Sequence, residues 1–294
     1  MERIIFGDNQ FFGINHFSEE KARQQAMKFQ DVSAILDVLQ SALNAGVKGF
    51  MCTTHDTVGA IADDVRADPA RWEGFHFYPG MPYAHKYANA VTELGYLGAL
   101  KKFIPAGGIV DTLTRGTRAV LGKDVESLMA MLVDAEMKMF AGLETPVVFL
   151  QNVVTDLILG LGANQVFASF AAYVKRRYDA EVGFFTMNLP KLLQALHSAG
   201  VERPIVCANV NKAGFRMSGG TEGYREAAAK YPARVIAMSV FASGGIAPRE
   251  AIEWVTNEPY VESIVFGASS RGNIENTVAL IREYDEKRGS VAKP

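Results

Sequence analysis

The sequence has little cysteine, no long apolar run and almost no net charge. Cys52 and Cys207 are its two cysteines; they stand far apart, each beside an apolar run, which favours reduced buried thiols over a disulfide framework or a cysteine zinc site. No apolar run approaches the length of a membrane span. The opening residues, MERIIFGDNQFFG, lack the pattern of a secretory signal. The sequence therefore predicts a cytoplasmic protein that does not enter a membrane.

The charges nearly cancel, with 30 basic against 32 acidic side chains and a net charge of -2. Such a balance gives no electrostatic reason to bind nucleic acid or an anionic membrane. The chain has 294 residues, of which 49% are hydrophobic, so it can bury a large core. We expect a globular metabolic protein whose partner is a small-molecule substrate. The oligomeric state stays open.

Short apolar runs alternate with longer amphipathic ones along the chain. Helical spacing is clear in 29–47, 189–201, 223–231 and 247–258. Strands that are apolar throughout and alternate with helices indicate a parallel sheet covered on both faces. Eight such units predict a single (β/α)8 barrel domain over 1–294, with a doubly wound sheet as the alternative. The strand candidates are residues 3–10, 48–56, 74–82, 146–152, 182–188, 204–211, 234–245 and 263–270.

One segment is too long for a simple barrel unit. Residues 82–143 separate the third and fourth strand candidates and contain two helix-like stretches, 92–104 and 124–143. We interpret the segment as the third barrel helix plus a helical insertion between strands three and four. Its centre, PAGGIVDTLTRGTRA, is rich in loop-forming residues. The insertion is either a lid over the pocket or a plain surface addition.

Polar residues gather near the predicted carboxyl ends of the strands, where barrels place their chemistry. We expect them to line one pocket and take Asp8, His55, Asp56, Tyr78, Asn152 and Lys212 as the candidate catalytic residues. Ordinary structural roles are the alternative: Asp56 and Asn188 suit helix caps, and a lone histidine is often structural. The full set is Asp8, Asn9, Gln10, Thr54, His55, Asp56, His76, Tyr78, Gln151, Asn152, Asn188, Asn209, Asn211 and Lys212.

Two turns near the end of the chain suit a phosphate. VFGASSRGNIENT at 265–277 is a strand that ends in small residues and opens a helix, and SGG occupies 243–245. Backbone N–H groups at a helix start attract anions, although a plain strand-to-helix turn uses the same residues. In a barrel these turns follow strands seven and eight, where phosphate sites are common. The candidate binding residues are Ser243, Gly244, Gly245, Gly267, Ser269, Ser270 and Arg271.

The last four units resemble the aldo-keto reductases. VGFFTMNLPKLLQAL is similar to the family's fifth-strand turn, PIVCANVNKAGFR to its sixth-strand region, SVFASGG to its seventh-strand cofactor loop, and FGASSRGNIENTVAL to its eighth-strand end. The resemblance covers about the last 115 residues. It implies an NADP site with Asn188 and Asn209 among its residues, Arg271 at the 2′-phosphate, and Glu275 with Asn276 near the adenine.

The family's catalytic Asp, Tyr, Lys and His are missing. Met51 and Asp56 stand at about the places of the Asp and the Tyr, the Lys is replaced within FHFYPGMP, and Gln151 or Asn152 replaces the His. A carbonyl reductase needs a proton donor, so this site must differ.

Three functions remain open. They are an NADP-dependent oxidoreductase with a remodelled proton donor, a lyase, aldolase or isomerase that binds a phosphorylated substrate, and an inactive barrel with a binding role. The spacing of the residues gives no metal site, although Asp8, His55, Asp56 and His76 leave a metal open.

Overall fold

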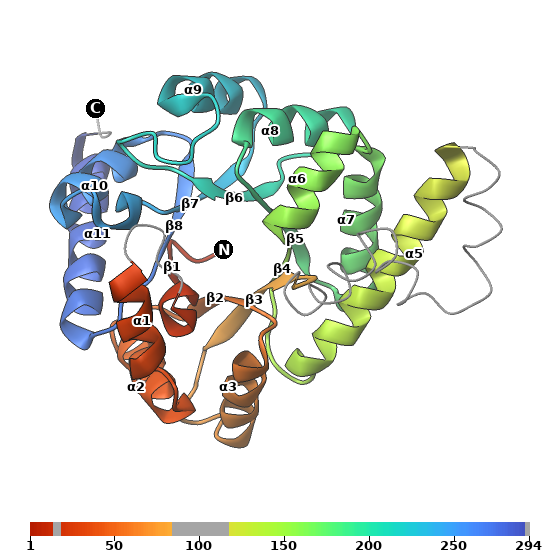
Figure 1. Cartoon of the computed structure of the whole chain (residues 1–294). Helices are drawn as coiled ribbons and strands as arrows, with labels where there is room; N and C mark the ends of the chain where they lie inside the picture. Colours follow the sequence, from red (N-terminus) through yellow and green to blue (C-terminus); the bar gives the residue numbers. More distant parts are fainter. Residues whose placement is uncertain (14–18, 84–117, 292–294) are drawn as a thin grey trace.

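The computed structural model is a closed barrel of parallel strands surrounded by helices (Figure 1). It describes residues 1–13, 19–83 and 118–291. The strands follow chain order around the barrel, and β1 pairs with β8, with Phe6 opposite Phe266. The predicted (β/α)8 barrel is therefore confirmed. The strands are β1 (Ile4–Gly7), β2 (Gly49–Thr53), β3 (His76–Met81), β4 (Val147–Leu150), β5 (Glu181–Thr186), β6 (Ile205–Asn209), β7 (Arg234–Met238) and β8 (Val261–Phe266).

The helices pack on the outside of the barrel, and their apolar faces form the main core with the outward-facing strand residues. Within the described ranges, no helix has both the length and the apolar character needed to cross a membrane. The helices are α1 (Glu19–Lys28), α2 (Val32–Asn44), α3 (Asp56–Ala67), α5 (Arg118–Met137), α6 (Asn152–Leu161), α7 (Gln165–Tyr178), α8 (Leu189–Ser198), α9 (Gly220–Lys230), α10 (Pro248–Asn257) and α11 (Arg271–Val291), with short 3-10 turns η1 (Asn9–Phe12), η3 (Lys138–Phe140) and η4 (Ala242–Gly244).

The long segment between β3 and β4 is described only in part. Its last portion forms α5 and η3, as the helical pattern over 124–143 predicts. The helix predicted at 92–104 and the loop predicted as a lid centre lie outside the described residues.

Large aromatic rings fill the interior of the barrel. Tyr78, Phe149 and Phe185 point inward from β3, β4 and β5, and the Phe149 and Phe185 ring centroids are 4.9 Å apart. Glycines make room for these rings. A Cβ at Gly49 would lie 2.5 Å from the Tyr78 ring, and one at Gly183 would lie 2.1 Å from the Phe149 ring. The interior is therefore a packed core in which large residues lie against glycines.

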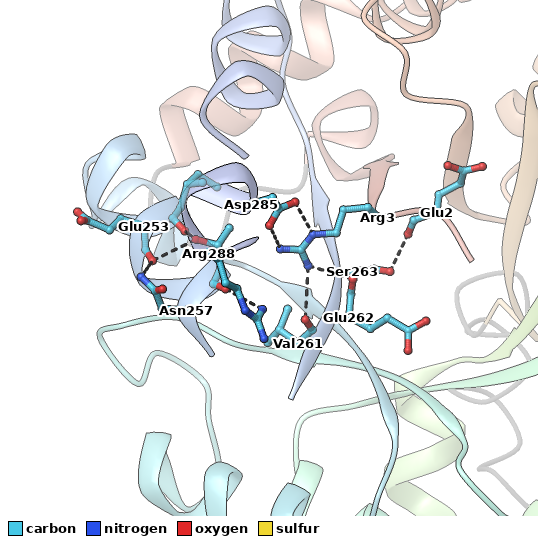
Figure 2. Close-up of polar contacts among 11 residues, drawn as sticks. Glu2, Arg3, Glu253, Asn257, Val261, Glu262, Ser263, Asp285 and Arg288 are labelled. Carbon is cyan, nitrogen blue, oxygen red and sulfur yellow. Dashed lines mark hydrogen bonds and ion pairs between the residues drawn. The ribbon is translucent and has the colours of Figure 1, made fainter. Parts of the chain in front are cut away.

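At the amino end of the barrel, polar contacts join the start of the chain to β8 and α11 (Figure 2). Arg3, just before β1, forms a two-point ion pair with Asp285 of α11, at 2.6 and 2.8 Å, and also donates to the carbonyl of Glu262 at 2.9 Å. The Ser263 hydroxyl donates to the carbonyl of Glu2 at 2.6 Å. These contacts attach the start of the chain to β8 and to the last helix.

The close packing of aromatic rings against glycines predicts that replacing such a glycine by alanine destabilises the protein. We expect Gly183→Ala to lower the free energy of unfolding by about 1–3 kcal/mol, because the added methyl overlaps the Phe149 ring. Gly160→Ala is the matched control: Gly160 lies in α6 with nothing within 4 Å of an added Cβ, so helix propensity should leave that variant equal to or more stable than wild type. Urea unfolding of both variants measures the difference. Equal stability of the two would contradict the packing described for the interior.

Candidate functional site

Asp8 is a buried carboxyl group at the carboxyl end of β1. Its side chain is held by Thr53 at the end of β2, whose backbone N–H and hydroxyl donate to Oδ2 at 2.7 and 3.0 Å. Only 7% of the residue is exposed, and this burial raises the pKa of Asp8 from 3.8 to about 6, against the lowering effect of the Thr53 hydrogen bonds. Asp8 therefore exchanges its proton close to neutral pH, which suits an acid or a base in catalysis.

Tyr83 lies at the same end of the barrel, two residues beyond β3. Burial raises the pKa of its phenol, and the negative charge of Asp8 raises it further. Burial and the same charge also raise the pKa of the Cys52 thiol. Tyr83 was not predicted from the sequence, since it lies inside the segment interpreted as an insertion. Its nearness to the end of a strand was the available signal.

His55 and Asp56 lie at the start of α3, directly after β2. Nδ1 of His55 accepts the N–H of Thr57 at 3.1 Å, so His55 is the N-cap of α3. The His55 ring is close to two aromatic rings, with its centroid 4.5 Å from that of Phe12 and 6.1 Å from that of Tyr83. Asp56 is exposed on the first turn of α3, where its negative charge interacts favourably with the positive end of the helix dipole. The structure thus places His55, rather than Asp56, beside Tyr83.

Glu136 is a buried carboxylate that holds residues at the carboxyl ends of β2 and β3. It is 4% exposed, lies in α5, accepts the Thr54 hydroxyl at 2.6 Å and accepts the backbone N–H of Tyr83 at 3.0 and 3.1 Å. It therefore connects the ends of β2 and β3 to α5. Nothing in the sequence links Glu136 to residues more than 50 positions earlier.

The prediction that His76 and Tyr78 lie at the carboxyl ends of the strands is wrong. Both lie near the amino end of the barrel, because His76 begins β3 and the Tyr78 hydroxyl accepts the backbone N–H of Glu2 at 3.4 Å. The hydroxyl also contacts Nε2 of His76 at 3.2 Å, and burial raises the pKa of Tyr78 to about 12. Tyr78 fills the barrel interior and does not join Asp8. Among the described residues, no three His, Cys, Asp or Glu side chains converge as metal ligands.

The two remaining candidate catalytic residues follow β4 and β6. Asn152 is the first residue of α6 and is half-buried. Lys212 pairs with Glu250 of α10 at 2.7 Å, and about half of each side chain is exposed. An exposed, paired ammonium lacks the desolvation that activates a Schiff-base lysine. The structure therefore gives no support to the predicted Schiff-base role of Lys212.

Asparagines after β5 and β6 hold the backbone of their own loops. Oδ1 of Asn188 accepts the N–H of Lys191 at 3.2 Å and caps α8, as the structural alternative predicts. Asn209 donates to the carbonyl of Arg216 at 3.1 Å. Asn211 both donates to and accepts from the backbone of Phe215, at 2.9 and 2.8 Å. These amides shape the rim of the barrel through the loops they fix.

The turn after β7 has an unusual backbone. Ser239, Ala242 and Ser243 all have positive φ, at 56°, 46° and 57°, which is costly for residues other than glycine. The N–H groups of Gly244 and Gly245 donate within the turn, to the carbonyls of Phe241 and Ala242 at 2.8 and 3.1 Å. The backbone N–H groups of Gly244 and Gly245, two of the predicted phosphate donors, are therefore already engaged within the turn.

The turn after β8 combines a helix start with two cationic side chains. Ser270 caps α11, since its hydroxyl accepts the N–H of Asn273 at 3.4 Å. Arg271 is exposed and pairs with Glu275 at 2.7 Å. Lys28, at the end of α1, donates to the carbonyl of Ser269. Lys28 was not predicted, because it is distant in sequence from the turn.

Among the predicted cofactor residues, Gly267 and Ser270 are exposed and Ser269 is half-buried in the β8 turn, and Glu275 and Asn276 are exposed on α11. Together with Lys28 and Arg271, the turn presents positive charge beside the amino end of a long helix. These residues fit an anionic phosphate group.

Comparison with solved structures identifies the fold. A Pseudomonas aeruginosa protein described as an aldo-keto reductase matches with a TM-score of 0.62 and 14% identity, over 96% of this chain and 91% of that one. A Bombyx mori aldo-keto reductase in complex with NADP matches with a TM-score of 0.57 and 8% identity, over 97% and 89%. The chain has the fold of the aldo-keto reductases. The likeness expected from the last 115 residues therefore extends over nearly the whole chain.

A Giardia lamblia aldose reductase shares this aldo-keto reductase fold, with a TM-score of 0.54 and 10% identity, over 95% of this chain and 87% of that one. Neither a protein-family model nor a curated protein matches the sequence.

The buried Asp8 carboxyl predicts a pH dependence of stability. Its pKa is higher in the folded protein than the ordinary 3.8, so between pH 4 and 6 the folded state holds the proton more tightly than the unfolded state. The contribution of Asp8 to stability is complete below pH 4 and declines as the pH rises to about 6. We expect the free energy of unfolding of wild type, relative to Asp8→Asn, to fall by roughly 2–3 kcal/mol over this window.

Urea unfolding of wild type and Asp8→Asn at several pH values from 4 to 7 tests this expectation. Asp37→Asn, on the exposed face of α2, is the control for removing one carboxylate. A constant difference between wild type and Asp8→Asn across the range would show that the pKa of Asp8 is not raised.

Proposed function

We propose that the protein is an NADP(H)-dependent oxidoreductase that acts on a small polar metabolite through a non-standard catalytic site. The observation that carries the proposal is a juxtaposition at one end of the barrel. Parallel pairing of β1 with β8 puts the buried Asp8 carboxyl and the cationic turn at Arg271 at the same end, after neighbouring strands. A proton-transfer group and a phosphate-binding turn at one barrel mouth are the components that such an enzyme needs.

The β8 turn is the proposed cofactor site. Lys28 and Arg271 attract phosphate, and the amino end of α11 adds the positive end of a helix dipole. Glu275, which now pairs with Arg271, and Asn276 lie on the first turns of the same helix. The Bombyx mori structure of the same fold was solved in complex with NADP, which supports the choice of cofactor. The nicotinamide cofactor, when bound, supplies or accepts the hydride.

Asp8 and Tyr83 are the proposed proton-transfer residues. Asp8, with a pKa of about 6, is mostly ionised at pH 7 and can accept the proton of a substrate hydroxyl during oxidation. Tyr83, whose pKa is raised, keeps its proton at neutral pH and can donate it to a developing alkoxide during reduction. The His55 ring packs beside Tyr83, and Glu136 holds the Tyr83 backbone. In this proposal, side chains that follow β1, β2 and β3 take the place of the reductase tetrad.

A lyase or isomerase acting on a phosphorylated substrate is the second candidate. It is favoured by Asp8, because a buried carboxyl with a pKa near neutrality can move a proton without any cofactor. In this alternative the β8 turn holds the substrate phosphate. An inactive barrel is opposed by the same buried carboxyl, whose burial is costly without a function.

Binding of NADPH is the primary test of the proposed function. We expect quenching of protein fluorescence by NADPH with a micromolar dissociation constant, and about tenfold weaker binding by Lys28→Ala and by Arg271→Ala, since each loses a charge-assisted contact. Arg249→Ala, which removes an exposed arginine paired with Glu283 on α11, is the matched control. Protection from thermal unfolding by a sugar phosphate but not by NADPH would favour the second candidate.

The role of Asp8 is tested by turnover. With NADPH and an activated aldehyde such as 4-nitrobenzaldehyde, and with the alcohol in reverse, we expect Asp8→Asn to lower kcat by about 100-fold or more, chiefly in oxidation. NADPH affinity should change by less than about twofold, because among the described residues the side chain of Asp8 is held by Thr53 and not by the β8 turn. Wild-type oxidation should slow as the pH falls through about 6. Unchanged kcat in Asp8→Asn, with Asp37→Asn as control, would remove Asp8 from the mechanism.

A further inference from the structure

Gln10 carries a buried polar atom that the fold leaves without a partner. The residue lies in η1, directly after β1, and is 5% exposed. Its Nε2 donates to the carbonyl of Gly7 at 2.7 Å. Its carbonyl oxygen, Oε1, is buried and has no hydrogen-bond partner. A buried acceptor without a donor is unfavourable, so its retention calls for an explanation.

The orientation of the Gln10 amide is fixed by chemistry. The Gly7 carbonyl can only accept a hydrogen bond, so the atom that faces it must be the amide nitrogen. Oε1 consequently faces the other way, toward the turn after β8. A Cβ placed on Gly267 would lie 2.1 Å from Oε1, so only glycine at this position leaves space for the carbonyl.

Gly267 connects this carbonyl to the proposed phosphate site. It is exposed at the barrel mouth and is three residues before Ser270, the cap of α11. The Gln10 carbonyl lies against Gly267, on the side to which a Cβ of that residue would point. Two kinds of group therefore meet at the β8 turn. Lys28 and Arg271 are positive and suit a phosphate, and the Gln10 carbonyl can accept a hydrogen bond from another part of the same ligand.

We infer that Gln10 is a ligand-binding residue, whose side-chain carbonyl accepts a hydrogen bond from a hydroxyl or amino group of the ligand held at the β8 turn. The inference rests on the proposed function and deepens it. It defines the ligand as a phosphate ester with a donor group close to the phosphate, as in a nucleotide. A bare inorganic anion has no such donor and leaves Oε1 unsatisfied. The protein therefore binds a ligand that has both the phosphate and the donor more tightly than one that has the phosphate alone.

The variant Gln10→Met tests the inference, because methionine keeps the length of the side chain and removes both polar atoms. We expect the dissociation constant of NADPH to rise about tenfold, the loss of one hydrogen bond. Sulfate, a doubly charged anion with no proton to donate, should compete with NADPH at the same concentration as in wild type. The melting temperature without ligand should change by no more than a few degrees, since the lost bond to Gly7 is offset by removal of the unsatisfied acceptor.

Gly267→Ala is the second variant, and its methyl group should displace the Gln10 carbonyl and weaken NADPH in the same way. Gln194→Met, on the exposed face of α8, is the control. Unchanged NADPH affinity in both Gln10→Met and Gly267→Ala would overturn the inference while leaving the proposed function in place. A large fall in melting temperature with equal weakening of NADPH and sulfate would show that Gln10 is only structural. Failure of the wild type to bind NADPH would overturn both the inference and the proposed function.

Discussion

The volume inside a closed eight-stranded barrel is the constraint on which the rest of the structure depends. Strand number and tilt set that volume, and side chains must fill it without overlap. This chain fills it with the rings of Tyr78, Phe149 and Phe185, and glycines on nearby strands leave the space that these rings occupy. The rings keep water out of the lower barrel and so leave the carboxyl end as the place where polar groups can meet a ligand. Asp8 is buried at that end, where Thr53 holds its carboxylate, and this burial raises its pKa.

Most polar residues at the barrel mouth stabilise loops, and only a few remain for chemistry. Asn188, Asn209 and Asn211 use their amides to cap a helix or to hold the backbone of the following loop. Such contacts fix the positions of the loops and cost little, because both partners are neutral and paired. Asp8 differs, since its carboxyl is buried with a pKa near neutrality. A polar group whose hydrogen bonds are all made within its own loop therefore has a structural role, and the groups left for catalysis are those that differ from it, such as Asp8.

The fold was predictable from the sequence, and the site only in part. Apolar runs bounded by polar residues indicate the strands, since a parallel sheet buries both faces of each strand. Asp8 and Arg271 were found because they adjoin strand ends. The position of Tyr78 along its strand was predicted wrongly: it lies in the first half of β3, and its hydroxyl reaches the amino end of the barrel. Glu136 and Lys28 were not found either, because helices distant in sequence bring them to the site, and no local pattern records such contacts.

The contact that Glu136 makes with Tyr83 affects where the chain can tolerate insertions and deletions. Its carboxylate accepts the backbone N–H of Tyr83 and so joins the end of β3 to α5. The entropy of closing a loop depends only weakly on its length, about 0.6 kcal/mol for each doubling. Residues added or removed between Tyr83 and α5 therefore change the stability of the barrel very little. The contact of Glu136 with Tyr83 therefore makes the stretch between Tyr83 and α5 the place where a change of loop length should disturb the barrel least.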